Sequence, residues 1–327
     1  MSQTSIMTTR GRRRLSALLP GKSGLLWVLL GLCVVAALIS PAFLNPVNLT
    51  NVLRQVSLFG IVSVGMTFVI LTKGIDLSVG SILGVCAVTA ATLLAMGWPV
   101  AAVIAIVLVV GVLQGAVNGL GITLGGVPPF IMTLGVMVMG RGLAMTIANG
   151  QPVSIRGVAA EFGWLGRGDF LGMPVPVWIF LLVSAVSIFV LRYTAYGRQV
   201  YAIGSNAEAA RLSGINVKAV EFSVYVISGF LAGLTGLIFV SRLTVGEPTA
   251  GTGIELEAIA ITVIGGTSLF GGEGTITGTI IGAGILAVLA NIMNLVGVSP
   301  FTQQIVKGAI IVGAVLYEMQ RNRRPKA

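Results

Sequence analysis

The chain has 327 residues, of which 55% are hydrophobic and only 9% charged, and it contains 45 glycines and no histidine. Soluble globular domains carry about a quarter charged residues, so this composition excludes a water-soluble protein and indicates one that lies in a lipid bilayer. The net charge of +10 does not indicate a nucleic-acid partner, because Lys and Arg accumulate in the cytoplasmic loops of membrane proteins.

Hydropathy predicts an all-α, polytopic membrane protein with about ten transmembrane helices of roughly 20 residues each. The expected helices cover residues 24–40, 51–72, 77–96, 99–124, 128–148, 174–192, 221–242, 256–271, 275–295 and 302–319. We interpret the first as a spanning helix and not as a cleaved signal, because it ends at Pro41 without a small-residue cleavage site.

The predicted organisation has three parts: a basic N-terminal tail (1–23), a single transmembrane domain (24–319) and a basic C-terminal tail (320–327). Most basic residues fall in the tails and in the loops on one side of the predicted helices, above all in residues 192–220. The positive-inside rule then places both termini and this loop in the cytoplasm.

The sequence argues against catalysis and against bound cofactors. Without histidine, and with Cys33 and Cys86 lying singly in apolar runs, we expect no catalytic residue, no metal site and no disulfide. A phosphate-binding loop would need a glycine five positions before Gly21, where the chain has Ser16, so we expect no ATP site either.

Asp76 lies among apolar residues at a helix boundary, where a charge is costly and tends to be functional. One hypothesis is an ion pair with Lys73, three residues earlier, if that stretch is helical. The other is that Gly74, Asp76 and Ser78 hold a broken helix open at a transport pathway, as gate structure and not as direct ligands of the substrate.

Polar pairs within the predicted spans are further candidates for a pathway. Gln114 and Asn118 share a helix face at i,i+4, and so do Asn291 and Asn294 at i,i+3. The alternative is a hydrogen bond between helices, worth about 1 kcal/mol. Arg141, inside a predicted span, must reach water or a partner that the sequence does not identify.

The 192–220 loop carries a short predicted helix. Ser205 and Glu208 have the spacing of a capping box, and Gly214 lies where a glycine would stop the helix. A helix of about seven residues is marginal in isolation, so it must dock against something. It either lies on the ends of its own spanning helices or enters a groove of a cytoplasmic partner, with Leu212 and Ile215 as apolar contacts and Arg211 as a polar anchor.

Several motifs together resemble a known family, the membrane permeases of bacterial ABC importers for monosaccharides. These motifs are Gly65-Met66-Thr67, Gly74 to Ser81, Gly204-x-Asn206 with Ala209 to Ile215, Pro248 to Gly253 with Glu255-Leu256, and Ile264 to Leu269 with Gly271-Gly272 and Gly274. They span residues 50 to 275 in the order of the family, and the similarity is greatest to its ribose-carrying members.

The resemblance implies a non-catalytic subunit in a bacterial inner membrane. Two permease copies, expected as a homodimer, would form the pathway for ribose, a separate cytoplasmic ABC ATPase would bind ATP and Mg²⁺, and a periplasmic protein would deliver the sugar. The segment that would contact the ATPase comprises Ser205, Asn206, Glu208, Ala209, Ala210, Arg211, Leu212, Ser213, Gly214 and Ile215.

The outer loops hold the expected docking site for the periplasmic protein. The candidates are Arg156, Glu161, Arg167, Asp169 and Glu247. Mixed charges of this kind would set the rate of association more than the affinity, unless they form only a solvated rim.

A self-sufficient secondary sugar transporter is the main alternative. Coupling to H⁺ or Na⁺ predicts titratable groups in the middle of the spans, whereas the only candidate there, Arg141, does not deprotonate.

Overall fold

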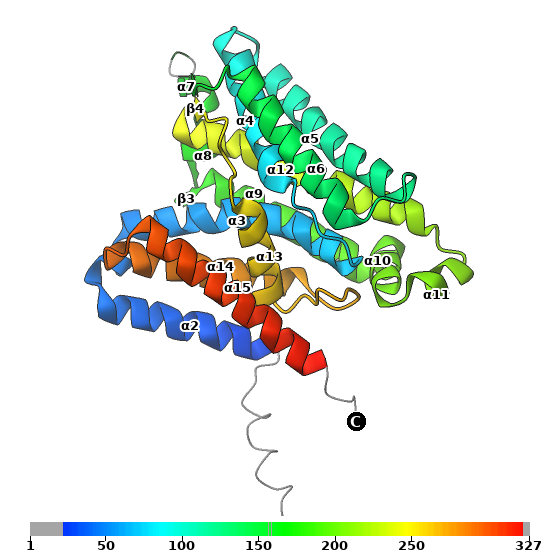
Figure 1. The fold of residues 1–327 in the computed structure, drawn as a ribbon. Coiled ribbons are helices and arrows are strands. Elements are labelled where there is room, and N and C mark those ends of the chain that lie inside the picture. Colours follow the sequence, from blue (N-terminus) through cyan, green and yellow to red (C-terminus); the bar gives the residue numbers. More distant parts are fainter. Residues whose placement is uncertain (1–21, 156, 158, 323–327) are drawn as a thin grey trace, which may run out of the picture.

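The computed structural model describes residues 22–155, 157 and 159–322, which form a bundle of helices with four two-residue strands (Figure 1). The residues before Lys22, the residues after Asn322, and Arg156 and Val158 lie outside this described part. The prediction of a mostly helical protein is confirmed, but the strands were not predicted. They lie in segments where the sequence indicated only loops.

The apolar ranges predicted from hydropathy each overlap one helix of the structure. In chain order these helices are α2 (Lys22–Ile39), α3 (Pro46–Leu71), α4 (Val79–Ala95), α5 (Val100–Thr123), α6 (Pro129–Ile147), α9 (Val175–Tyr193), α12 (Val217–Leu243), α13 (Ile254–Ile264), α14 (Ile276–Leu295) and α15 (Pro300–Asn322). Within the described residues, 6 helices are long and apolar enough to cross a membrane: α3, α5, α6, α9, α12 and α14. Residues 24–39, 79–95 and 300–316 form shorter apolar helices.

Short elements connect these helices at the two ends of the bundle. They are the 3₁₀ helix η1 (Pro41–Leu44), α7 (Ala159–Phe162), α8 (Trp164–Arg167), α10 (Ala195–Ser205) and α11 (Ala207–Leu212). Strand β1 (Val153–Ser154) pairs antiparallel with β4 (Val245–Gly246), and β2 (Asp169–Phe170) pairs with β3 (Met173–Pro174). Helices α10 and α11 lie at one end of the molecule, and α7, α8 and β4 lie at the opposite end (Figure 1).

Helix α13 is shorter than predicted. The expected helix over 256–271 ends at Ile264, and residues 265–275 form a loop in which Gly266, Gly271 and Gly272 have positive φ angles. Helix α13 has 11 residues, so it extends about 16 Å, roughly half of the hydrocarbon core of a bilayer. The apolar segment is therefore a broken helix, and this break accounts for part of the difference between the predicted and observed numbers of spanning helices.

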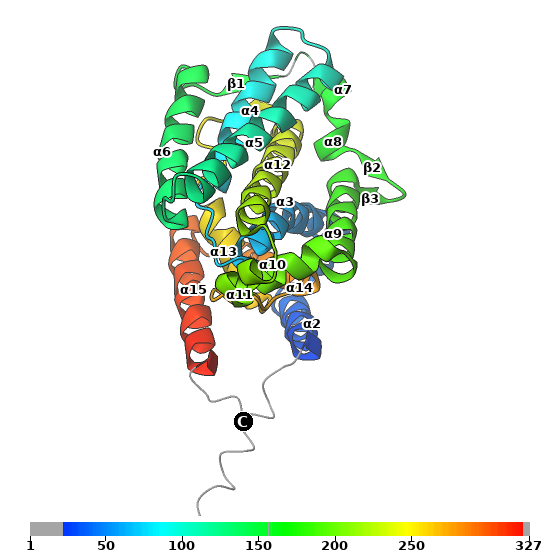
Figure 2. The ribbon, with the colours of Figure 1, turned by 90° about the vertical axis from the view of Figure 1, so that its right-hand side faces the viewer.

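Helix α12 lies at the centre of the bundle, packed against α3, α4 and α5 (Figure 2). Its closest neighbour is α5, because glycines face each other where the two helices cross. A Cβ atom on Gly115 would overlap the carbonyl oxygen of Tyr225, and one on Gly229 would overlap the carbonyl oxygen of Gly111. Since burial from lipid gives little energy, such close backbone contact is a main source of helix association in membranes.

The first prediction concerns this crossing. We expect Gly229→Ala to destabilise the protein by about 2 kcal/mol, because the new methyl group must push α12 away from α5. The measurement is thermal unfolding of the purified chain in detergent. Gly142→Ala is the control, since no atom lies within 4 Å of its Cβ position, and it should leave stability unchanged or slightly raised. Equal stability of the two variants would contradict the packing argument.

Candidate functional site

The chain leaves the helical conformation between α3 and α4, around a buried carboxylate. Asp76 is completely buried, at 0% exposure. Its Oδ1 accepts hydrogen bonds from the backbone N–H of Ser78 at 3.0 Å and from the Ser78 hydroxyl at 2.6 Å. Its Oδ2 accepts from the hydroxyl of Ser228, on α12, at 2.7 Å. The carboxylate therefore joins the start of α4 to the central helix.

Two further spanning helices contact the same break. The side-chain amide of Asn118, on α5, donates to the Ser78 oxygen at 2.7 Å, and Thr133, on α6, donates to the carbonyl of Ile75 at 3.2 Å. We call Asp76, Ser78, Asn118 and Ser228 the Asp76 cluster. The cluster ties α4, α5 and α12 together at one level of the bundle.

Gly74 and Lys73 shape the backbone that leads into the cluster. A Cβ atom on Gly74 would overlap the hydroxyl of Tyr225, so any larger residue there would require the Tyr225 side chain to move. Lys73 has φ 66°, and it closes α3 with hydrogen bonds from Lys73 N to Ile70 O and from Gly74 N to Val69 O. This pattern is a Schellman motif with a lysine at the left-handed position that glycine usually takes.

The hypothesis that Lys73 pairs with Asp76 is wrong. Lys73 Nζ lies 3.3 Å from the carbonyl oxygen of Ser205. Among the described residues, none of the ion pairs includes Asp76. The left-handed turn at Lys73 directs its side chain toward α10, so the two residues do not share a helix face. The geometry agrees with the other hypothesis, in which hydrogen bonds to Asp76 hold a broken helix.

The remaining pathway candidates are separated from the cluster or bonded to other helices. Gln114 Nε2 reaches only the carbonyl of Val110, in its own helix, at 3.5 Å. The amide of Asn291 exchanges two hydrogen bonds with Asn48 on α3, and Asn294 accepts from Gln303 on α15 at 2.7 Å. These contacts of α14 favour the alternative of hydrogen bonds between helices over a shared, water-lined face.

Arg141 has partners that the sequence could not identify. Its Nη1 donates to the carbonyl oxygens of Pro248 at 3.0 Å and Ala250 at 2.8 Å, in the segment between β4 and α13. The carboxylate of Glu255 is near enough for its charge to act on the guanidinium. Backbone carbonyls have no sequence signature, so only the fold reveals this contact.

The 192–220 loop contains two helices instead of one. Helix α10 was not predicted, and it buries Gly197, Val200, Ile203 and Gly204 on one face. Helix α11 begins after Asn206, whose Oδ1 accepts from the N–H of Ala209 at 3.0 Å. The predicted capping box is therefore wrong, because Ser205 is the last residue of α10.

Glu208 binds Arg211 within α11. The ion pair spans 2.6 Å between Glu208 Oε1 and Arg211 Nη2, and both side chains are exposed. The hydrogen bond from Arg211 lowers the pKa of the Glu208 carboxyl below its ordinary value. An exposed pair of this kind contributes little to stability, so the role of Arg211 as an anchor for a partner stays a prediction.

The stop signal at the end of α11 is confirmed. Gly214 has φ 83°, its N–H donates to Arg211 O at 3.0 Å, and the N–H of Ile215 donates to Ala210 O at 3.1 Å, which together form a Schellman motif. Ala210 is buried, and Ile215 packs against the main core, contrary to the expected outward contact. Leu212 remains 74% exposed.

Helix α10 contacts the two places where the chain leaves the helical conformation, the end of α3 and the 265–275 loop. A Cβ atom on Gly204 would overlap the carbonyl oxygen of Leu71 and the backbone nitrogen of Gly272. The N–H of Gly272 donates to Leu71 O at 3.0 Å, and the Tyr201 hydroxyl donates to Gly274 O at 2.9 Å. We call this contact of α10, the end of α3 and the 265–275 loop the junction. Leu71, the α3 residue of the junction, lies five residues before Asp76 in the sequence.

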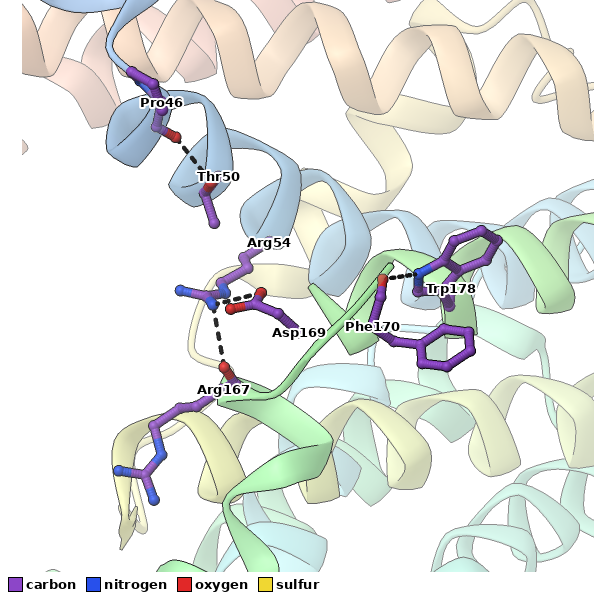
Figure 3. Close-up of polar contacts among 7 residues, drawn as sticks. All are labelled: Pro46, Thr50, Arg54, Arg167, Asp169, Phe170 and Trp178. Atoms are coloured by element: carbon purple, nitrogen blue, oxygen red, sulfur yellow. Dashed lines mark hydrogen bonds and ion pairs between the residues drawn. The ribbon is translucent and has the colours of Figure 1, made fainter. Parts of the chain in front are cut away.

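The predicted docking residues lie at the opposite end of the molecule, apart from Arg156, which is outside the described residues. Glu161 and Arg167 are exposed, Glu247 accepts a hydrogen bond from Thr249 at 2.9 Å, and Asp169 forms an ion pair with Arg54 of α3 at 3.4 Å (Figure 3). Arg54 lies near the outer end of a predicted span and was not among the predicted docking residues.

A second prediction tests the Asp76 cluster. We expect Ser228→Ala to destabilise the protein by about 2 kcal/mol, because Asp76 Oδ2 loses its donor in a buried site. Thermal unfolding in detergent is the measurement. Ser184→Ala is the matched control: its hydroxyl is also buried but has no partner, so its removal should cost little. Equal thermal stability of the Ser228→Ala and Ser184→Ala variants would contradict the role of Ser228 as a donor to Asp76.

Comparisons with known proteins agree on one family. A family model described as "Branched-chain amino acid transport system / permease component" matches residues 48–315. The ribose import permease protein RbsC of Escherichia coli (strain K12) is 45% identical over 316 residues, which cover 96% of this chain and 98% of the relative. RbsC of Bacillus subtilis (strain 168) is 45% identical over 293 residues, covering 89% of this chain and 90% of the relative.

A relative with a different named sugar matches almost as broadly. The xylose transport system permease protein XylH of Escherichia coli (strain K12) is 38% identical over 343 residues, covering 86% of this chain and 87% of the relative. No solved structure matches the chain. Because the family model covers most of the sequence and these relatives match along nearly their whole length, the chain belongs to this permease family, as a multi-pass membrane protein of the sugar ABC importer type.

Proposed function

We propose that this chain is the translocation subunit of an ATP-driven importer for a monosaccharide, and that the sugar is ribose. The observation that carries the proposal is the junction, because it links an exposed helix at one end of the molecule to a broken helix inside it. The choice of ribose rests on the names of the relatives that are 45% identical.

We place a separate ABC ATPase on α11, in the cytoplasm together with both termini. An apolar side chain as exposed as Leu212, on a helix held firmly at both ends, suits a groove on a partner protein. ATP and Mg²⁺ would bind to that ATPase, and this chain would do no chemistry. Ala209 and Ser213 lie exposed near Leu212 and would share the contact.

The contacts of the junction support a mechanism for this proposal. A push on α11 passes to α10 and then to the end of α3 through Gly204, Leu71 and Gly272, which are too closely packed to slide past one another. Displacement of α3 changes the break that Asp76 holds against α12. The cluster would thus act as the gate of the pathway, without binding sugar itself.

We assign delivery of sugar to the end that carries α7, α8 and β4, which we place in the periplasm. A sugar-binding protein would dock there, with Glu161, Arg167, Asp169 and Glu247 guiding its approach. A second copy of the chain would complete the pathway as a homodimer. The sequence-based assignment of basic segments to the cytoplasm supports this orientation.

A third prediction concerns α11. Leu212→Glu should abolish ATP-driven sugar uptake and weaken co-purification with the ATPase at least tenfold. The reason is that a charge would enter an apolar groove, and a tenfold loss of affinity corresponds to about 1.4 kcal/mol. The protein should remain folded, since the side chain is exposed. Met96→Glu is the control. Met96 is also exposed, directly after the last residue of α4 and so at the end of that helix away from Asp76, and its variant should transport normally. Uptake retained by Leu212→Glu would exclude this contact.

A fourth prediction concerns the energy source. The purified chain in liposomes should not accumulate ribose under a proton or sodium gradient, and accumulation should require the ATPase, the binding protein and ATP. This experiment matters because Asp76 is a titratable group inside the bundle, which the sequence placed only at a boundary. Accumulation driven by an ion gradient alone would instead support a secondary transporter.

A further inference from the structure

A pocket of about 360 Å³ opens at the start of α9, a volume typical of small-molecule sites. Its lining residues are Trp164, Gly168, Asp169, Phe170, Val175 and Trp178. The rings of Phe170 and Trp178 meet edge to face, with centroids 6.0 Å apart (Figure 3). Trp178 Nε1 donates to the carbonyl of Phe170 at 2.9 Å, so this wall presents ring surface and suits an apolar occupant.

The pocket continues into an apolar flank of the molecule. Beyond Trp178, α9 exposes Leu181, Leu182, Val186 and Phe189. The helix ends at the exposed Tyr193, over whose ring the Arg192 guanidinium lies at 5.5 Å. Tryptophan and tyrosine at the two ends of an apolar helix are typical of the two membrane interfaces. Figure 2 shows β2 and β3 at the edge of the molecule beside α9. The exposed apolar side chains of α9 suit contact with lipid, and Trp178, which lines the pocket, suits the level of the headgroups.

Two arginines, Arg54 and Arg242, lie near the edge of the pocket that Asp169 forms. Arg54 pairs with Asp169 at 3.4 Å and donates to the carbonyl of Arg167 at 3.2 Å, as drawn in Figure 3. The Nε of Arg54 is buried and has no hydrogen-bond partner. Arg242, at the end of α12, is close enough to be affected by the charge of Arg54. Arg54 and Arg242 outnumber the carboxylate of Asp169, so positive charge exceeds negative charge around this ion pair.

We propose that the pocket binds an anionic phospholipid, with an acyl chain against the aromatic wall and the phosphate beside Arg54. A pocket on a lipid-facing flank is filled from the bilayer, and the excess of arginine selects a negative headgroup. A sugar would find mainly ring faces and a carboxylate that Arg54 already engages. The inference depends on membrane insertion and not on which solute the protein carries.

The test measures retained lipid by native mass spectrometry. The intact chain is equilibrated in nanodiscs with equal amounts of phosphatidylglycerol and phosphatidylcholine and then released into detergent. The wild type should retain phosphatidylglycerol about fivefold over phosphatidylcholine, the factor that one basic residue gives at a membrane surface. Combined Trp164→Ala and Trp178→Ala should lose the lipid. Trp98→Ala, which removes an exposed tryptophan between α4 and α5, should keep it.

Opposite charge changes separate lipid selection from a structural role. Arg54→Gln should reduce the headgroup preference to near unity, and Asp169→Asn, which removes the carboxylate, should increase it. A purely structural ion pair would lower the melting temperature in both variants without changing the lipid ratio, and that result would overturn the proposal. Equal retention of the two lipids by the wild type would also overturn the proposal. So would variants that keep their lipid and lose binding of a sugar-binding protein.

Discussion

The buried carboxylate of Asp76 imposes a constraint on the rest of the fold. A buried carboxyl group inside a membrane protein is stable only if hydrogen bonds replace the water that it has lost. Ser78 and Ser228 supply these bonds, and Asn118 orients Ser78 in turn. Because the donors come from different helices, α4, α5 and α12 must keep one arrangement for the group to remain satisfied. A change in that arrangement changes the energy of the whole bundle.

Close helix packing supplies the second requirement. Gly111, Gly115 and Gly229 let α5 and α12 approach until backbone atoms touch, which fixes the heights at which Asn118 and Ser228 face Asp76. Packing and polar satisfaction therefore support each other. The glycines of α5 and α12 therefore do more than allow close packing, because they also set where the two helices meet along their length.

The sequence predicted those features that depend on composition and on local chemistry. Apolar runs gave the long helices, Gly214 gave the end of α11, and the Gly74 to Ser78 segment gave a break in the spans. It failed where the deciding contact is remote. Leu269 and Phe270 extend the apolar pattern beyond Ile264, so hydropathy carried the predicted helix to residue 271, into a loop that Gly271 and Gly272 turn toward α10. The partners of Arg141 are backbone carbonyls and leave no trace in a residue pattern.

One hydrogen bond of the junction limits how this protein can vary. The carbonyl of Leu71 is among those that a helix leaves unpaired at its end, and the N–H of Gly272 is the group that satisfies it. The number of residues between Ile264, the end of α13, and Gly272 is therefore fixed by where the end of α3 lies. Insertions or deletions in that stretch would move the donor away from its acceptor, whereas the exposed turn between α4 and α5 has no comparable tether in the described structure and should tolerate changes of length.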